Sequence, residues 1–232
     1  MLSKLKKALD ETSKTPVTSV ARFFKVGTGH YAEHDQFLGI SVPQLRTIAK
    51  QFPNLLLAEI RELLYSPFNE ERLLALFILV NQYKKGDSLT KERIYQFYCD
   101  NLNQVNNWNL VDSCAHLIVG AHLHADAAKK DILITLAQST NIWHRRIGII
   151  ATWYFIKQHE YEWTLTMAQY LLNDTHDLIH KAVGWMLREV GEKDLQQLKK
   201  FLDQHAQKMP RTMLRYAIEK LPEQERKQYL VK

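Results

Sequence analysis

Apolar residues recur along most of the chain at intervals of three and four, which is the period of an amphipathic α-helix. The pattern predicts helices over residues 2–12, 16–24, 43–51, 54–65, 68–84, 90–103, 123–138, 141–158, 161–172, 176–191, 193–207, 210–220 and 222–231. Pro43 suits a first helical turn, and Asn54 and Thr90 are candidate N-caps. No stretch alternates apolar and polar residues convincingly, as a half-buried strand would. The pattern therefore predicts an all-α protein.

Charged residues precede apolar stretches at nearly regular intervals along this series of helices. They are Arg72, Asp112, Arg146, Lys181 and Arg215, separated by 40, 34, 35 and 34 residues. A small residue follows each of them at a similar offset, which lets neighbouring helices pack closely. Two-helix repeats of this length stack into a solenoid. We therefore predict one HEAT-like helical-repeat domain over residues 1–232 with a concave basic face; a helical bundle with coincidental spacing is the alternative.

Composition and charge agree with this fold class and add a hint about partners. The chain has 232 residues, 46% of them apolar, and so can bury a substantial core. Its 8 Gly and 6 Pro are few for the many turns of an all-β protein. A formal net charge of +6 and a pI near 9.2 favour a polyanionic partner, although many ordinary proteins share such a balance.

Nothing in the sequence predicts a membrane-bound or secreted protein. The longest apolar run, residues 73–80, is too short to cross a bilayer, and lysines interrupt the amino terminus where a signal peptide needs its apolar core. Cys99 and Cys114 lie within apolar helical patterns without a CxxC spacing, which indicates buried thiols in a reducing compartment. We expect a soluble, cytoplasmic protein.

Two features contain residue types that bind ligands in other proteins. Residues 25–35, the only long non-periodic segment, hold a Gly-Thr-Gly triplet but lack the context of a phosphate-binding loop, so a surface turn or small hairpin is predicted. The histidines, among them His116, His122 and His124, match no metal-binding signature. We therefore expect neither a metal nor a cofactor.

Trp108 and Asp112 form the most suggestive pair in the chain. They are four residues apart, so on a helix they share one face. Asp112 is also the only acid at a repeat position that is otherwise basic. A carboxylate facing a polyanion weakens binding unless it meets positive charge or takes part in chemistry, which makes Asp112 the candidate catalytic residue.

Cations at the repeat positions are candidate phosphate ligands, because arginine grips phosphate oxygens with two N–H groups. Lys181, Trp185 and Arg188 follow one another at helical spacing. Trp143 is expected in the packed core. The candidate phosphate-binding residues are Arg146, Lys181, Arg188, Arg211 and Arg215, and Arg72 belongs to the same basic row; ordinary solvated helix faces are the alternative.

Segments at residues 106–112, 141–146, 181–189 and 209–217 together resemble the AlkD-type DNA alkylation-repair glycosylases, a HEAT-like repeat family. The resemblance runs in consistent order from about residue 20 to about residue 220. It implies an enzyme that removes cationic N3- and N7-alkylated purines from double-stranded DNA and leaves an abasic site. We expect a monofunctional enzyme that acts as a monomer. No lysine matches a nucleophile position, which argues against lyase chemistry.

Matched residue by residue, the resemblance places Asp112 on the catalytic carboxylate and Trp108 and Trp185 on the aromatics of an exposed lesion cleft. Arg146 falls on a phosphate-binding arginine. Phe23 stands where some members carry a tyrosine near the DNA, so a hydroxyl is missing there. The rival functions are a non-catalytic binder of damaged or branched DNA on the same fold and a protein–protein scaffold.

Overall fold

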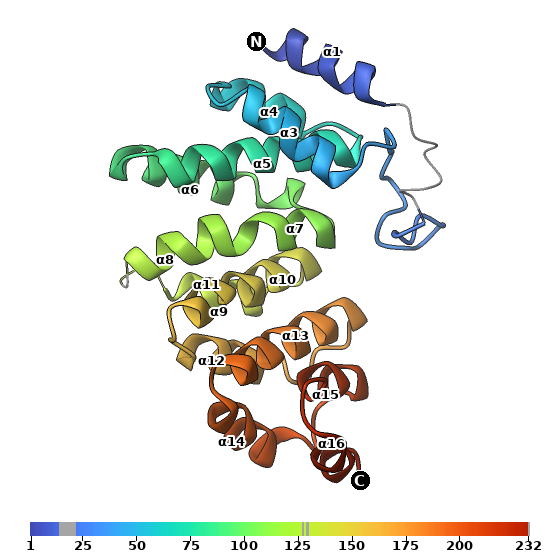
Figure 1. The fold of residues 1–232 in the computed structure, drawn as a ribbon, viewed down its shortest axis with the longest axis vertical. Coiled ribbons are helices and arrows are strands. Elements are labelled where there is room, and N and C mark those ends of the chain that lie inside the picture. The colour runs from blue at the N-terminus through green and yellow to red at the C-terminus, as the bar shows by residue number, and fades with distance from the viewer. Residues whose placement is uncertain (14–21, 127, 129, 232) are drawn as a thin grey trace. The chain divides into compact units, whose positions relative to one another are not determined.

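The computed structural model describes residues 1–13, 22–126, 128 and 130–231 (Figure 1). These residues fold into helices joined by turns, and the only β-pairing among them is an isolated parallel bridge between Gln36 and Phe68. The predicted all-α helical-repeat fold is confirmed. Of the predicted helix 16–24, residues 16–21 lie outside the described residues, and residues 22–24 form a turn.

The chain forms two compact units, residues 1–114 and 115–232. This division does not test the predicted single domain over residues 1–232, which stays a prediction. The helices of the first unit are α1 (Leu2–Thr12), α3 (Val42–Gln51), α4 (Leu57–Leu64), α5 (Asn69–Lys85), α6 (Ser88–Asp100), the 3₁₀ turn η1 (Leu102–Gln104) and α7 (Trp108–Ala115), whose last residue already belongs to the second unit.

Helix α5 forms the core of the first unit. Residues 73–80 are all buried, because the helix is apolar around its whole circumference. Helices α3 and α4 both pack against it, and α6 follows it after Gly86 (Figure 1). This packing fixes the amino-terminal end of α5, which contributes polar side chains to the candidate site.

The second unit contains a π-helical turn and a series of short helices around the longer α13. Its elements are η2 (His116–Gly120), α8 (Ala121–Ala125), α9 (Ile132–Ala137), α10 (Ile142–Ala151), α11 (Trp153–Lys157), α12 (Glu162–Tyr170), α13 (Asp177–Lys193), α14 (Leu195–His205), α15 (Arg211–Ala217) and α16 (Glu223–Leu230). Helix α13 packs against α10, α14 and α15. It contains the candidate residues at positions 181, 185 and 188.

Two glycines bring backbones into direct contact in the second unit. A Cβ atom on Gly184 would lie 2.4 Å from the backbone oxygen of Met213, and one on Gly120 would lie 2.1 Å from that of Ala151. These distances are shorter than any real Cβ contact. The expectation that small residues allow close helix packing is confirmed at Gly184, where α13 meets α15.

Several helix boundaries differ from those expected. The predicted helix 123–138 is wrong, because α8 ends at Ala125, Asp126 has an extended backbone and α9 begins only at Ile132. Helix α6 is capped by Asp87 rather than Thr90: the Asp87 carboxylate accepts the Thr90 N–H at 2.8 Å. Helix α4 begins at Leu57, beyond the proposed cap at Asn54. Caps are decided by local side-chain bonds that apolar periodicity does not reveal.

Candidate functional site

Trp108 begins α7, and Asp112 lies one helical turn later on the same face. The buried side chain of Asn107 fixes this end of the helix, because its Oδ1 accepts the backbone N–H of Trp108 at 2.7 Å. Trp108 and Asp112 are both half-buried. The predicted pair is therefore held at a defined helix start and keeps partial access to solvent.

The segment before α3 fixes the ring of Trp108. The Trp108 Nε1–H donates to the hydroxyl of Tyr31 at 3.2 Å, and the ring of Phe24 stacks on the indole at a centroid distance of 5.3 Å with 24° between the planes. Both partners lie more than seventy positions away in the sequence, and apolar periodicity does not predict either contact. They restrict the rotation of the indole and hence the direction that it presents to a ligand.

The Gly-Thr-Gly segment is a surface turn, as predicted, and residues 25–35 form no hairpin. Its backbone closes through a hydrogen bond from Ala32 N–H to Lys25 O of 3.1 Å. Gly29 has a φ of +76°, a conformation that favours glycine. Next to this segment, Phe23 is 61% exposed, with the Arg22 guanidinium 4.9 Å from its ring centroid. Its contact with DNA stays a prediction.

Asp35 ends this segment and links it to α5 and α7. Its side chain is only 7% exposed and forms an ion pair with Arg72. The same carboxylate accepts the Nδ2–H groups of Asn69 at 3.0 Å and Asn107 at 2.6 Å. Asn107 thus connects the Asp35 network to the helix start that holds Trp108.

Arg72 of the basic row is buried and already engaged by protein groups, and its contact with phosphate stays a prediction. The residue is 4% exposed, and its guanidinium is engaged by Asp35 and by the backbone oxygens of Ser66 and Pro67 at 2.9 and 3.3 Å. A buried guanidinium needs such partners, since leaving it unpaired is costly. Equal spacing along the repeat therefore does not ensure equal exposure.

In the second unit, Trp185 and Trp153 share one carboxylate. Both indole N–H groups donate to Glu189: Trp185 to Oε1 at 2.9 Å and Trp153 to Oε2 at 3.0 Å. The two rings meet edge to face at a centroid distance of 4.9 Å and an angle of 62°. Trp185 is half-buried, and its place in a lesion cleft stays a prediction. Sequence reasoning singled out Trp185 and missed both Trp153 and Glu189.

Arg146 on α10 is more buried than an arginine side chain that is free to bind phosphate. It is 5% exposed, and its guanidinium donates to the backbone oxygen of Leu178. Its neighbour Arg145 pairs with Asp174 at 2.6 Å, and Trp143 is 8% exposed, as expected for a core residue. Phosphate binding by Arg146 stays a prediction.

The cations of α13 have acidic partners. Lys181 Nζ lies 2.7 Å from Asp177 Oδ2, and this hydrogen bond is the main reason why the pKa of Asp177 is lowered. Arg188 forms an ion pair with Glu219 of the following segment. Any phosphate that bound these cations would compete with the carboxylates, which reduces the gain from each contact.

The cations of α15 are the more accessible ones. Arg211 is exposed and donates to the backbone oxygen of Leu230 at 2.9 Å, and Arg215 is exposed one turn later. Their phosphate binding stays a prediction. That Asp112 and Trp185 line a shared cleft also stays a prediction, because these two residues belong to different units.

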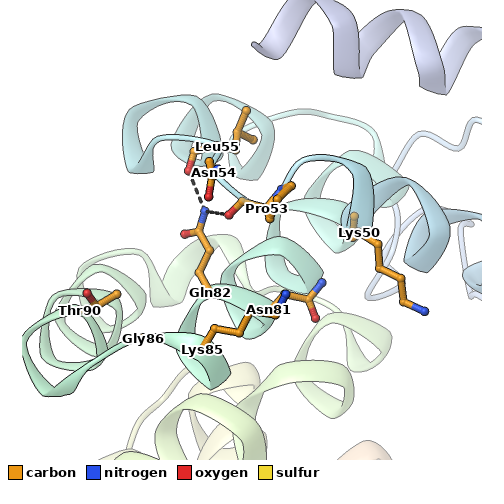
Figure 2. A pocket seen from close by; sticks show the side chains of 10 residues that line it. Lys50, Pro53, Asn54, Leu55, Asn81, Gln82, Lys85, Gly86 and Thr90 are labelled. Atoms are coloured by element: carbon orange, nitrogen blue, oxygen red, sulfur yellow. Dashed lines mark hydrogen bonds between the residues drawn. The ribbon is translucent and has the colours of Figure 1, made fainter.

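The structure also contains a cavity apart from the candidate residues of the first unit. It has a volume of about 760 Å³ and is lined by Lys50, Asn81 and Lys85 among others (Figure 2). Gln82 borders it and donates through Nε2 to the backbone oxygens of Pro53 and Leu55 at 3.0 and 2.8 Å. Trp108 and Asp112 are not among its lining residues, so the candidate site does not coincide with this cavity.

Histidines serve local contacts where the structure describes them. The ring centroids of His116 and Trp153 lie 4.5 Å apart, and His124 Nε2 lies 3.0 Å from a carboxylate oxygen of Glu160. Among the described residues, no three His, Cys, Asp or Glu side chains are grouped in a way that would hold a metal ion. No helix in the same part of the chain is long and apolar enough to cross a bilayer.

Comparison with known proteins adds independent information about the whole chain. The profile of the family described as DNA alkylation repair enzyme matches residues 3–221. A solved structure described as a predicted DNA alkylation repair enzyme from Enterococcus faecalis superposes with a TM-score of 0.70 at 14% identity, covering 89% of this chain and 95% of that one. At this identity the likeness shows the fold. A comparison with curated proteins found no match. Because the family profile spans nearly the whole sequence, the chain belongs to the family of DNA alkylation repair enzymes.

Proposed function

We propose that the protein is a monofunctional DNA glycosylase, which hydrolyses the N-glycosidic bond of cationic N3- or N7-alkylated purines in duplex DNA and leaves an abasic site. Membership of the repair family supports a role on alkylated DNA. The observation that carries the proposal is the pair at the start of α7: Asp112 lies one turn after Trp108, whose indole is held by Tyr31 and Phe24.

The chemistry needs only one carboxylate. When the C1′–N bond breaks, its electron pair neutralises the cationic base, which leaves without being protonated, and the sugar becomes oxocarbenium-like. The Asp112 carboxylate stabilises this positive charge and accepts a proton from the water whose oxygen attacks C1′. The half-buried position of Asp112 suits this role, because partial desolvation strengthens its attraction for the sugar cation.

The aromatic residues would bind the damaged nucleotide. An indole face attracts a cation, and alkylation at N3 or N7 makes the purine cationic. Trp108 and Trp185 are the proposed aromatic contacts, and Arg146, Lys181, Arg188, Arg211 and Arg215 the proposed phosphate contacts. We also propose that the protein acts as a monomer in the cytoplasm.

A base-release assay tests the proposal. Methylated duplex DNA is incubated with the purified protein, and free N7-methylguanine and N3-methyladenine are measured by chromatography. Asp112→Asn, which keeps the shape of the side chain and removes its charge, should slow release about 10²–10⁴-fold. Asp10→Asn is the matched control, because Asp10 is an exposed acid on α1 and its replacement should leave the rate unchanged.

The outcome separates the proposed enzyme from its rivals. Release of neither base by the folded wild-type protein would reject glycosylase activity on these lesions. If such a protein still bound damaged duplex more tightly than intact duplex, a non-catalytic binder would be the better description. Trapping with borohydride should give no covalent adduct, since a monofunctional glycosylase forms no Schiff base with the sugar.

A further inference from the structure

Glu189 occupies an unusual position between two tryptophans. Each of its carboxylate oxygens accepts one indole N–H, from Trp185 at 2.9 Å and from Trp153 at 3.0 Å. An indole N–H can only donate, so both oxygens act as acceptors here. One side chain therefore fixes the orientation of two large aromatic rings that come from different helices, α11 and α13.

The shared carboxylate fixes the two indole rings relative to each other. They stand edge to face at 62°, with their centroids 4.9 Å apart. Rotating either indole about its χ angles would break its bond to Glu189 and its contact with the other ring. Trp153 and Trp185 thus form a single aromatic pair, and because both residues are half-buried, part of the pair stays accessible to a ligand.

The carboxylate also changes the electrostatics of the rings. A hydrogen bond from an indole N–H to an anion shifts electron density toward the ring and makes its π-face more negative. The attraction for a cation over that face increases accordingly. One cation already lies over this ring: Lys157 Nζ is 3.9 Å from the centroid of the Trp153 ring.

We infer that Glu189 is a positioning residue that holds Trp153 and Trp185 as one pair and adjusts this pair for positively charged bases. The inference rests on the proposed function, since it concerns recognition of the cationic purine, and it adds Trp153 and Glu189 to the residues that determine specificity. A purely structural role would need only two hydrogen-bond acceptors. The role inferred here needs the negative charge as well.

The test measures preference for charge separately from catalysis. Two duplexes carry a 2′-fluorinated nucleotide, which resists hydrolysis because fluorine destabilises the oxocarbenium-like sugar. One bears N7-methylguanine, which is cationic, and the other bears guanine, which is neutral. The ratio of their dissociation constants, measured by fluorescence anisotropy, reports the preference for the cationic base.

The decisive variant is Glu189→Gln, which removes the charge and replaces one of the two acceptor oxygens by an NH2 group, so it weakens both parts of the inferred role. We expect its preference for the cationic duplex to fall about three- to tenfold below that of the wild type. Glu192→Gln is the matched control: Glu192 is exposed on the same helix, and its replacement raises the net charge equally but should leave the ratio unchanged. An unchanged ratio in folded Glu189→Gln, or an equal fall in the control, would overturn the inference.

A second variant covers the case in which Glu189→Gln does not fold. Trp153→Phe keeps an aromatic ring and removes the N–H that joins it to Glu189. It should also lower the charge preference, whereas a folded Trp153→Phe protein with the wild-type ratio would overturn the inferred role of the pair.

Base release from the unfluorinated N7-methylguanine duplex distinguishes this inference from the proposed function. If the wild type prefers the cationic duplex, loses that preference in Glu189→Gln and yet releases no base, the glycosylase proposal fails and the aromatic pair stands. If the wild type releases the base but Glu189→Gln keeps the full preference, the proposed function stands and the inference fails. A wild type without any preference for the cationic duplex would also reject the inference.

Discussion

Replacing Asp35 by alanine removes the acceptor that Arg72, Asn69 and Asn107 share. The side chains of Asp35 and Arg72 are only 7% and 5% exposed, so water cannot easily replace the lost carboxylate as a hydrogen-bond acceptor. Breaking a buried pair from one side costs about 3–5 kcal/mol, because the remaining charge stays buried without compensation. The two asparagines each lose a hydrogen bond worth about 1 kcal/mol, partly recovered by local rearrangement. We expect the free energy of unfolding to fall by about 3–5 kcal/mol.

Urea denaturation followed by circular dichroism measures this loss. With a slope of about 2–3 kcal/mol per molar urea, the midpoint of Asp35→Ala should fall by about 1–2.5 M. Glu33→Ala is the matched control: Glu33 is an exposed acid of the same segment, with a single bond to Gly29 N–H at 2.8 Å, and its loss should cost about 1 kcal/mol or less.

A double variant tests the physical reason itself. In Asp35→Ala with Arg72→Met neither charge of this ion pair remains, so a substantial part of the lost stability should return. The reasoning would be refuted by a loss below about 1 kcal/mol in Asp35→Ala, or by a double variant less stable than Asp35→Ala alone.

Other predictions concern titration, thiol reactivity and DNA binding. Burial raises the pKa of Glu70 above its usual 4.5 in spite of three N–H groups from residues 38–40, so the folded state holds this proton more tightly than the unfolded state. Stability should therefore fall as the pH rises from about 4.5 through the raised pKa, and urea midpoints of Glu70→Gln should lack this part of the fall. Burial raises the pKa of Cys114 to about 12, so a thiol reagent at about pH 8 should modify half-buried Cys99 first and reach Cys114 only after denaturation; equal rates in the native protein would contradict this. Replacing exposed Arg215 by alanine should lower the slope of log K for DNA binding against log salt by about one, and an unchanged slope would remove Arg215 from the phosphate contacts.

Local relationships in this protein were predictable from the sequence. Most helices follow from apolar periodicity, and Trp108 and Asp112 share a face because residues four apart always do on a helix. Glu189 could have been recognised in the same way, since it lies four residues after Trp185. Trp153 lies 36 residues before Glu189, close to one repeat length, and this spacing was a usable signal that these residues meet.

Contacts that depend on the tertiary arrangement were not predictable in this way. Asn107 reaches Asp35 across 72 positions, in a segment without periodicity. Arg72 has the same offset as the other repeat cations, but a position in a repeat does not specify what covers it. Its burial depends on the course of residues 22–41, which follow no regular secondary structure beyond turns and one bridge. Exposure, and with it the distinction between a structural and a DNA-binding arginine, is a property of the assembled fold.

The glycines of this chain should differ in the substitutions that they tolerate under selection. At Gly120 and Gly184 a neighbouring backbone occupies the space of a side chain, so in a library of random variants even alanine should be lost from both positions. At Gly29 no atom lies within 4 Å of an added Cβ, and the constraint is the φ of +76° alone. Asparagine and aspartate tolerate that conformation better than other residues and should persist there. The identities of the surviving residues would thus reveal which glycines serve packing and which serve backbone conformation.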